Sequence, residues 1–330
     1  LDIQGVQVQI GQQRADDSPL WGARRWCPTL HFLNDVLLQP ARQQFQRATI
    51  ADVLFDFLCN SSVCRSGFVV CRTRPLKWNL APAGPTPPSP CPMTPCESML
   101  RVHQFAALAS GPRLLVLGAV HGNETCGTQG IHRLVAELDA GQLSLTSGTL
   151  TLVPISNPLA YNKGQRNGER NLNRNLRPST APQDFEDRIA NALCPLLAGH
   201  DTLLDLHSFQ SSGQPFAMIG PANNTGELQP FSLAAQEQAL VLRLGVRRIV
   251  EGWLETYAVG VASRLARTAP LDRAGLLSTD PEYGVGTTEY MRRQGGYAIT
   301  LECGQHDDPG GPELAYQAIR RTLAHLGMVA

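Results

Sequence analysis

The segment that most restricts the fold is an almost continuously apolar run at residues 113–120, Arg-Leu-Leu-Val-Leu-Gly-Ala-Val. A strand without polar alternation is typical of the centre of a parallel sheet that is covered on both faces. Directly after it, apolar residues recur at helical spacing and predict a helix over 126–142. These apolar positions are Ile131, Leu134, Val135 and Leu138. The chain therefore contains a strand–turn–helix unit of the kind from which α/β folds are built.

The alternation of strand and helix patterns continues to the end of the chain. We expect further strands at 149–156, 202–208, 215–219, 247–252 and 297–303. Helices are expected at 184–198, 231–244 and 287–294, followed by a terminal helix with Leu314, Ala318, Ile319, Leu323 and Leu326 on one face. This pattern predicts an α/β fold, with a mixed, mostly parallel sheet and helices on both faces.

Two potential metal ligands, His121 and Glu124, lie in the turn after the first strand. Open α/β sheets bind ligands at this edge, and Zn²⁺ accepts imidazole nitrogen and carboxylate oxygen, although the pair alone is equally compatible with turn chemistry. A catalytic zinc site needs a third protein ligand, and His207, at the end of the apolar run 202–209, is the candidate. Asp205 points to the same side of that strand, so it is expected either to orient the imidazole or to cap a nearby turn.

A hydrolytic zinc site also needs a base, and Glu302 is the candidate. It lies near the end of an apolar segment, 297–304, where an unpaired carboxylate costs several kcal/mol. Either Glu302 faces an active-site cleft or it pairs with a buried arginine, and the other site residues favour the cleft. The adjacent Cys303 would need a nearby base to act as a nucleophile, so we expect an ordinary thiol. His200, in the loop before the strand at 202–208, is expected to be solvated.

A polar, amide-rich loop, residues 157–175, lies between the first metal-binding motif and His207. Its length and its many donors indicate a functional loop. Arginine binds carboxylates through a planar fork and can polarise a carbonyl oxygen, so Arg166, Arg170 and Arg174 are candidates for substrate contacts. Their spacing is also that of one basic helix face, but the glycines and asparagines of the loop oppose a long helix. A phosphate site would require a Gly-rich turn opening a helix, which is missing here.

A set of histidine, glutamate, asparagine and arginine side chains resembles the motifs of the succinylglutamate desuccinylase/aspartoacylase family, which is related in fold to the zinc carboxypeptidases. The set consists of His121, Glu124, Asn173, Arg174, His207 and Glu302. The resemblance covers residues 100–330. It implies one zinc ion per chain, held by His121, Glu124 and His207, with Glu302 as the general acid/base.

The resemblance also implies substrate contacts. The pair Asn173 and Arg174 matches the one that grips a substrate carboxylate, and Arg166 is placed like the arginine that polarises the scissile carbonyl. Arg292, ten residues before the general base, matches a further carboxylate-binding arginine, with Arg293 as the competing assignment.

The chain departs from the family after Glu302. Family members carry a β-rich domain there that helps to close the site, whereas 28 residues follow Glu302 in this sequence. The insertion at 211–285, with its prolines, glycines and asparagines, is the natural source of loop elements over the cleft. This departure concerns how the site is closed and therefore which substrate it accepts. The residues expected to hold zinc and to act as the base are all present.

Composition predicts a soluble, cytoplasmic globular protein. The 28 basic and 28 acidic side chains balance, which gives no indication of a nucleic-acid partner. No apolar run approaches the roughly 20 residues that span a bilayer, and the start lacks a secretory signal pattern. The sequence does not reveal the oligomeric state.

The N-terminal segment, residues 1–96, has a different composition, rich in cysteine, proline and tryptophan. Its prolines at 75–95 are typical of an extended linker, so we expect a poorly ordered extension, with a small disulfide or metal module as the alternative. It could also be an upstream extension, in which case Met93 or Met99 would be a native start. The hydrolase domain is expected at 97–330.

The leading hypothesis is a zinc amidohydrolase that deacylates an N-acyl amino acid or a similar small carboxylate. A metallocarboxypeptidase acting on short peptides is the rival, because an Asn–Arg pair would hold a terminal carboxylate equally well. A catalytically silent zinc-binding module on the same fold is the third hypothesis.

Overall fold

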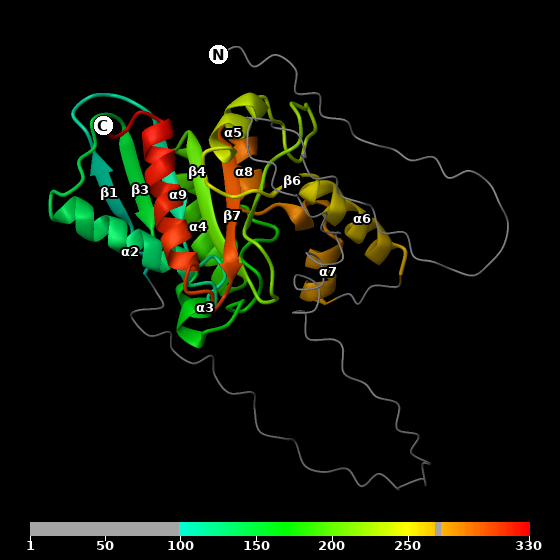
Figure 1. The fold of residues 1–330 in the computed structure, drawn as a ribbon. Coiled ribbons are helices and arrows are strands. Elements are labelled where there is room, and N and C mark those ends of the chain that lie inside the picture. The colour runs from blue at the N-terminus through cyan, green and yellow to red at the C-terminus, as the bar shows by residue number, and fades with distance from the viewer. Residues whose placement is uncertain (1–98, 268–271) are drawn as a thin grey trace, which may run out of the picture.

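The computed structural model describes residues 99–267 and 272–330 (Figure 1). The expectations for the extension 1–96, its linker and a start at Met93 lie outside the described residues. The three cysteines of the described part, Cys126, Cys194 and Cys303, are buried free thiols, which agrees with the ordinary thiol expected at Cys303.

A seven-stranded sheet forms the centre of the fold, in the order β1-β3-β2-β4-β7-β5-β6. Its strands are β1 (His103–Ala106), β2 (Arg113–Leu117), β3 (Thr149–Val153), β4 (Thr202–Phe209), β5 (Phe216–Met218), β6 (Ile249–Val250) and β7 (Tyr297–Gln305). The pairs β3–β2, β2–β4, β4–β7 and β5–β6 are parallel, whereas β1–β3 and β5–β7 are antiparallel. The expectation of a mixed, mostly parallel sheet is therefore confirmed.

Helices cover both faces of the sheet (Figure 1). One apolar cluster joins the sheet to α2 (Cys126–Asp139), α5 (Ala234–Val241) and α9 (Gly311–His325). A second cluster joins the opposite face to α4 (Phe185–Ala198) and α8 (Thr287–Arg293).

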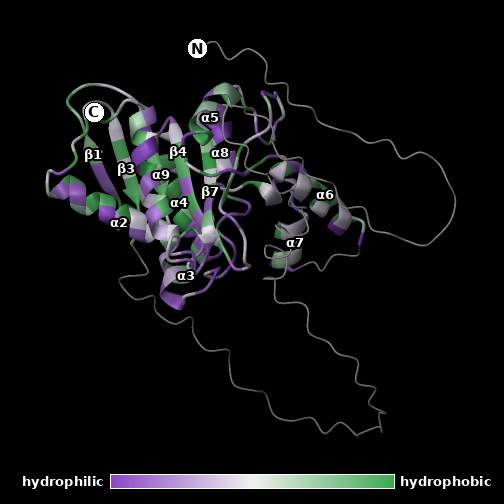
Figure 2. Cartoon of the chain, viewed as in Figure 1, coloured by the Kyte–Doolittle hydropathy of each residue, from purple (hydrophilic) through white to green (hydrophobic). Residues whose placement is uncertain are grey.

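The position of β2 between two helical layers explains why its sequence is apolar at nearly every position. Leu114 and Val116 belong to the first cluster, and Leu115 and Leu117 belong to the second. Successive side chains of a strand point to opposite faces, so a strand between two helical layers buries all of them. In Figure 2 the apolar residues follow the strands, and polar residues lie on the outer sides of the helices.

Strand β2 ends earlier than the apolar pattern predicts, at Leu117 instead of residue 120. Ala119 adopts a left-handed backbone with φ of 44°. The chain therefore turns while it is still apolar and buried. The turn is held to the end of β3, because Gly118 donates to the carbonyl of Val153 at 2.9 Å.

The insertion 211–285 contains helices that the sequence pattern did not reveal. They are α6 (Trp253–Leu265) and α7 (Arg273–Thr279), followed by the 3-10 turn η1 (Pro281–Gly284). They lie beside the β6 end of the sheet (Figure 1). The expectation that this insertion supplies loops is therefore wrong in part.

Three further local expectations need correction. The edge strand β1 was missed because its burial alternates over four residues only. The polar loop begins with one short helix, α3 (Pro158–Lys163). His200 is buried instead of solvated, since its ring nitrogens contact the carbonyl of Leu196 at 2.6 Å and the hydroxyl of Thr151 at 2.7 Å.

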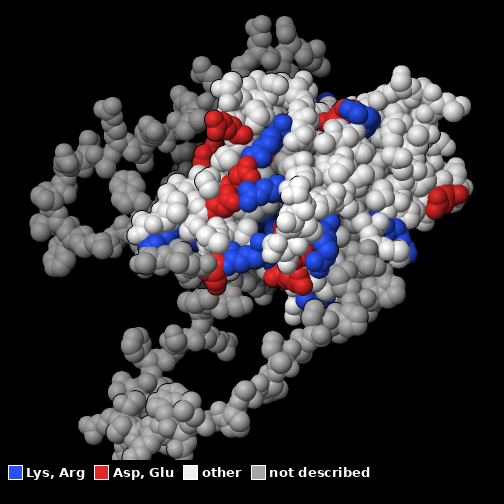
Figure 3. Space-filling view, turned by 180° about the vertical axis from the view of Figure 1, so that it is seen from behind, with Lys and Arg blue, Asp and Glu red and all other residues white. Residues whose placement is uncertain are grey.

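Charges of both signs are mixed on the one face of the molecule that Figure 3 shows. Figure 3 shows acidic and basic side chains interleaved on the face opposite to the view of Figure 1, whereas nucleic-acid-binding surfaces gather basic side chains. Among the helices of the described residues, none has the length and apolar character required to cross a bilayer.

The close approach of α2 and α9 yields a stability prediction. A Cβ on Gly130 of α2 would lie 2.8 Å from the backbone nitrogen of Tyr316 and 3.0 Å from the Cβ of Ala315. Gly130→Ala should therefore lower the free energy of unfolding by about 1–2 kcal/mol, because overpacking outweighs the gain from replacing a helical glycine. Gly260→Ala on α6 is the matched control, since its Cβ would meet only the flexible end of Arg264. Denaturant unfolding should show this control unchanged or stabilised, and equal effects of both substitutions would contradict the packing argument.

Candidate metal centre

Three side chains from distant parts of the sequence converge at the carboxyl edge of the sheet. His121 and Glu124 lie in the turn between β2 and α2, and His207 lies near the end of β4. Since β2 and β4 are parallel neighbours, their carboxyl ends meet at one edge. One ligand atom from each of these residues lies within 4.8 Å of the others, and all three side chains are buried.

Both imidazoles turn the same ring nitrogen toward the shared carboxylate. His121 Nδ1 lies 2.9 Å from Glu124 Oε1, and His207 Nδ1 lies 2.8 Å from Glu124 Oε2. The opposite ring nitrogens face outer acceptors, Asn171 Oδ1 at 3.1 Å for His121 and Asp205 Oδ2 at 3.0 Å for His207. An outer acceptor fixes the orientation of a metal-binding imidazole, so Asp205 occupies the position predicted for it.

Two residues of this arrangement were missed in the sequence. Asn171 contacts His121, and Thr287 donates its hydroxyl hydrogen to the carboxylate of Asp205. The asparagine-rich composition of the loop was the only available signal for Asn171. Nothing in the local sequence of Thr287 connects it with a residue 82 positions away.

Burial and the charges of neighbouring side chains shift the pKa of each of the three residues. Burial, with the charge of Arg166, lowers the pKa of His121 to about 4, so this imidazole is neutral at pH 7. Burial opposes the charge on His207, yet the Asp205 and Glu124 carboxylates hold its pKa well above the usual value. The two imidazoles likewise overcome the effect of burial on Glu124 and hold its pKa well below the usual value.

These donors fit a divalent cation. Zinc takes nitrogen and carboxylate oxygen at about 2.0–2.2 Å, which requires donor atoms roughly 3–4 Å apart. One donor atom from each of His121, Glu124 and His207 lies within 4.8 Å of the others, which is close to this spacing. Metal binding requires neutral imidazoles, so loading would displace the proton that His207 otherwise holds. The buried group can therefore hold a metal ion.

Glu302 lies beside these ligands, on β7. Parallel pairing places it directly opposite His207. The side chain is fully buried, and neither carboxylate oxygen has a hydrogen-bond partner within the described ranges. Burial, reinforced by the charge of Glu124, raises the pKa of Glu302 to about 8. Of the two alternatives left open by the sequence, an arginine pair or a cleft, the geometry agrees with the cleft.

A small pocket opens beside His207 and Glu302. Its lining includes the candidate carboxylate-binding residues and several apolar side chains. The lining residues are Asn173, Arg174, His207, Met218, Ile219, Trp253, Thr288, Glu289, Arg292, Thr300 and Glu302.

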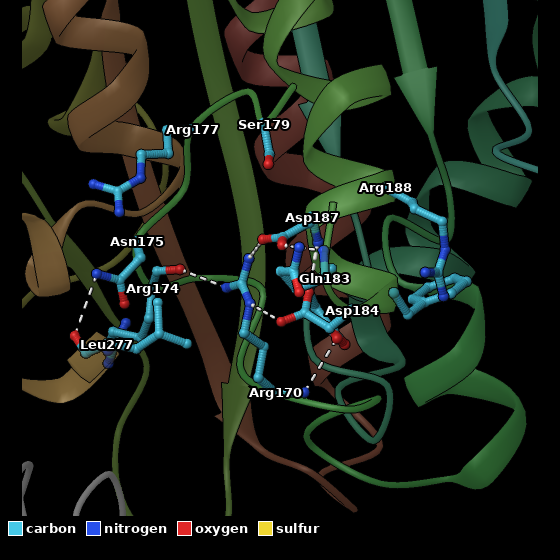
Figure 4. A network of polar contacts seen from close by, with 12 residues as sticks. Arg170, Arg174, Asn175, Arg177, Ser179, Gln183, Asp184, Asp187, Arg188 and Leu277 are labelled. Atoms are coloured by element: carbon cyan, nitrogen blue, oxygen red, sulfur yellow. Dashed lines mark hydrogen bonds and ion pairs between the residues drawn. The ribbon is translucent and has the colours of Figure 1, made fainter. Parts of the chain in front are cut away.

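The arginines of the polar loop have three different environments, so the alternative of one basic helix face does not apply. Arg166 Nη1 lies 2.6 Å from Glu124 Oε1, in contact with a candidate metal ligand. Arg170 pairs with Asp184 at 3.0 Å and Asp187 at 2.9 Å, and donates to the carbonyl oxygen of Arg174 at 2.8 Å (Figure 4). Arg170 is thus a support for the loop, whereas Arg174 reaches the pocket.

A buried carboxylate, Glu186 of α4, fixes the middle of the loop. It accepts hydrogen bonds from the backbone nitrogens of Gly168 at 3.1 Å and Arg170 at 3.1 Å, and from the amide of Asn157 at 3.0 Å. A Cβ on Gly168 would lie 2.4 Å from the Glu186 carboxylate, which explains the glycine. Sequence reasoning missed Glu186, because it reads as one of several acidic residues at a helix start.

Arg174 and Asn173 bring the loop to the pocket wall. The Arg174 guanidinium carbon lies 4.1 Å from the centre of the Tyr257 ring, and Nη2 donates to the Tyr257 hydroxyl. Asn173 Oδ1 accepts from the backbone nitrogen of Thr287, at the start of α8, at 2.9 Å. Tyr257 was also missed in the sequence, because it belongs to a helix of the insertion.

Arg292 and Arg293 point to different places. Arg292 lines the pocket and is 3% exposed, with its guanidinium against the buried carboxylate of Glu237. Arg293 pairs with Glu282 at 2.8 Å, away from the pocket lining. The structure therefore brings Arg292 together with the other predicted site residues and leaves Arg293 outside.

Comparison with known proteins gives a family match and a shared fold. Residues 110–244 match the succinylglutamate desuccinylase/aspartoacylase catalytic domain. An aspartoacylase family protein from Mesorhizobium loti MAFF303099 is 26% identical, with a TM-score of 0.50 over 70% of this chain and 62% of that chain. Comparison with curated proteins gives no match.

Two further solved structures share the fold. A succinylglutamate desuccinylase/aspartoacylase from Rhodobacter sphaeroides is 19% identical, with a TM-score of 0.52 over 70% of this chain and 60% of that chain. The ectoine utilization protein EutE (DoeB) from Ruegeria pomeroyi, in a product-bound structure, is 23% identical, with a TM-score of 0.51 over 69% of this chain and 61% of that chain. The chain thus spans about three fifths of the length of these proteins.

The family match covers the His121–Glu124 turn, the polar loop and His207, which carry most of the motifs read from the sequence. The resemblance is therefore confirmed over residues 110–244, which match the model of the succinylglutamate desuccinylase/aspartoacylase catalytic domain.

Proposed function

We propose that this chain is a zinc-dependent amidohydrolase that removes the acyl group from an N-acyl amino acid or a similar small carboxylate. One observation carries the proposal: Glu302, buried without a hydrogen-bond partner within the described ranges, lies beside three convergent metal-ligand side chains. The family match supports a deacylase-type activity. In this proposal residues 97–330 form the hydrolase domain, the protein is cytoplasmic and its substrate is a small molecule.

The ligand residues would be His121, Glu124 and His207, with one zinc ion per chain. Zinc at such a site supplies Lewis-acid polarisation and lowers the pKa of a water molecule toward neutrality. Asn171 and Asp205 keep the two imidazoles oriented toward the shared carboxylate.

The remaining steps belong to side chains of the pocket. Glu302 accepts the proton of the attacking water and returns it to the leaving amine. Arg174 and Asn173 bind the substrate carboxylate and so present the correct amide. Arg166, held against Glu124, stabilises the negative charge that develops on the carbonyl oxygen.

The rival hypotheses differ in what they predict for substrates. A carboxypeptidase would use Arg174 for the terminal carboxylate of a short peptide, so dipeptides belong in the same assay panel as N-acyl amino acids. Hydrolysis that is lost on chelation and restored by zinc would exclude a catalytically silent metal-binding module.

The first test concerns the base. Glu302→Gln should retain metal but lower kcat by about 10²–10⁴-fold, because the amide cannot accept the proton. Metal content and turnover are measured on the same preparation. Glu313→Gln, at an exposed position of α9, is the matched control and should turn over normally. Near-normal turnover of Glu302→Gln would refute the assignment of the base.

The second test concerns the ligand set. His207→Ala should lose both metal and turnover, because two protein donors remain. Metal content after dialysis, measured by atomic emission, checks this expectation. Full occupancy in the variant would remove His207 from the ligand set.

The third test uses the metal-free protein. The pKa of Glu302 rises from 4.5 to about 8 on folding, so the folded state resists ionisation of this carboxyl group. The free energy of unfolding of the wild type should therefore fall as the pH rises from about 4.5 to about 8, because the unfolded state releases the Glu302 proton at a lower pH than the folded state. Glu302→Gln lacks this loss. We expect its melting temperature to exceed that of the wild type at pH 8, with the difference shrinking toward pH 4.5; a constant difference would contradict the raised pKa.

A further inference from the structure

Two arginines, Arg174 and Arg292, line the pocket, and Arg292 is paired with a carboxylate of the protein. Arg292 Nε lies 3.2 Å from both carboxylate oxygens of Glu237, and Nη2 contacts the same carboxylate. Nη2 also donates to the carbonyl oxygen of Ala298 at 2.7 Å, and Nη1 lies 3.7 Å from Glu289 Oε1. All three guanidinium nitrogens therefore face protein acceptors.

This arrangement is built into the fold and is not a surface pair that opens easily. Glu237 on α5 and Arg292 on α8 are 1% and 3% exposed. Gly220 completes the contact, because its backbone nitrogen donates to Glu237 Oε1 at 3.0 Å. A Cβ on Gly220 would lie 2.6 Å from Arg292 Nε, so only glycine lets the guanidinium lie against this backbone.

The charges at this end of the pocket do not favour a second anion. Two carboxylates, Glu237 and Glu289, face the single guanidinium of Arg292. A substrate carboxylate placed here would compete with Glu237 for the same fork of donors and would be repelled by both acids. The pocket lining also includes the apolar side chains of Met218, Ile219 and Trp253.

We infer that the substrate carries one carboxylate, bound at Arg174, and an uncharged, apolar amino-acid side chain that lies toward Arg292. The inference rests on the proposed function and deepens it. Glu237 is a positioning residue in this account, because it sets selectivity by occupying Arg292 and does not touch the reacting atoms.

The wild-type preference is the first test. The zinc-loaded full chain is assayed at pH 8 with N-acetylmethionine and N-acetylleucine against N-acetylaspartate and N-acetylglutamate. We expect kcat/KM for the apolar substrates to exceed that for the acidic ones by about tenfold or more, from like-charge repulsion. Equal or higher kcat/KM for the acidic substrates would overturn the inference and leave the proposed function intact.

Substitution of Glu237 is the second test. Glu237→Gln keeps the shape but releases the charge of Arg292, so the acidic substrates should gain about tenfold in kcat/KM relative to the apolar ones. The double variant Glu237→Gln/Arg292→Gln should lack this gain, because no released guanidinium remains. Glu255→Gln, an exposed charge removal on α6, should leave the ratio unchanged. An unchanged ratio in folded Glu237→Gln would overturn the inference.

A binding measurement separates this inference from the proposed function and does not depend on the variants. Isothermal titration of the zinc-loaded wild type with methionine and with aspartate reports pocket selectivity without turnover. Tighter binding of methionine supports the inference even if no N-acyl amino acid is hydrolysed, in which case the proposed function alone fails. Tighter binding of aspartate would overturn the inference.

Discussion

The buried carboxylate of Glu124 is the contact on which the site depends. Two imidazoles, the backbone nitrogen of Ser208 at 3.2 Å and the guanidinium of Arg166 surround its two oxygens. An isolated buried carboxylate would cost far more free energy than a small domain can spare, so these partners must all be present together. The shared carboxylate thereby ties the turn after β2, the end of β4 and the polar loop to one point.

Much of the fold and the centre of the site could be predicted because their signals are local. An apolar run bounded by a turn identifies a buried strand, and parallel packing brings strand ends together without knowledge of the partners. His121, Glu124 and His207 lie at such ends and do converge. The early end of β2 could not be predicted, since Ala119 reads as one more apolar strand residue while its backbone is left-handed.

The parts that could not be predicted depend on partners far away in the sequence. The role of Arg292 in the structure is set by Glu237, 55 residues before it, and no spacing rule connects them. Glu186 and Tyr257 likewise acquire their contacts with the polar loop only through the tertiary fold. Consequently the motifs indicate the resemblance to the family, whereas pairs such as Glu237 and Arg292 become visible only in the structure.

The insertion contacts the polar loop directly through Tyr257 and indirectly through Asp184. Tyr257 of α6 contacts Arg174 directly, and Arg273 of α7 reaches Asp184 at 2.7 Å, the same carboxylate that holds Arg170. Replacement of α6 and α7 by another segment would thus remove both contacts, together with the pocket wall that Trp253 of α6 supplies. Selectivity in this fold can therefore diverge by exchange of a peripheral helical pair, while the residues that perform the chemistry stay the same.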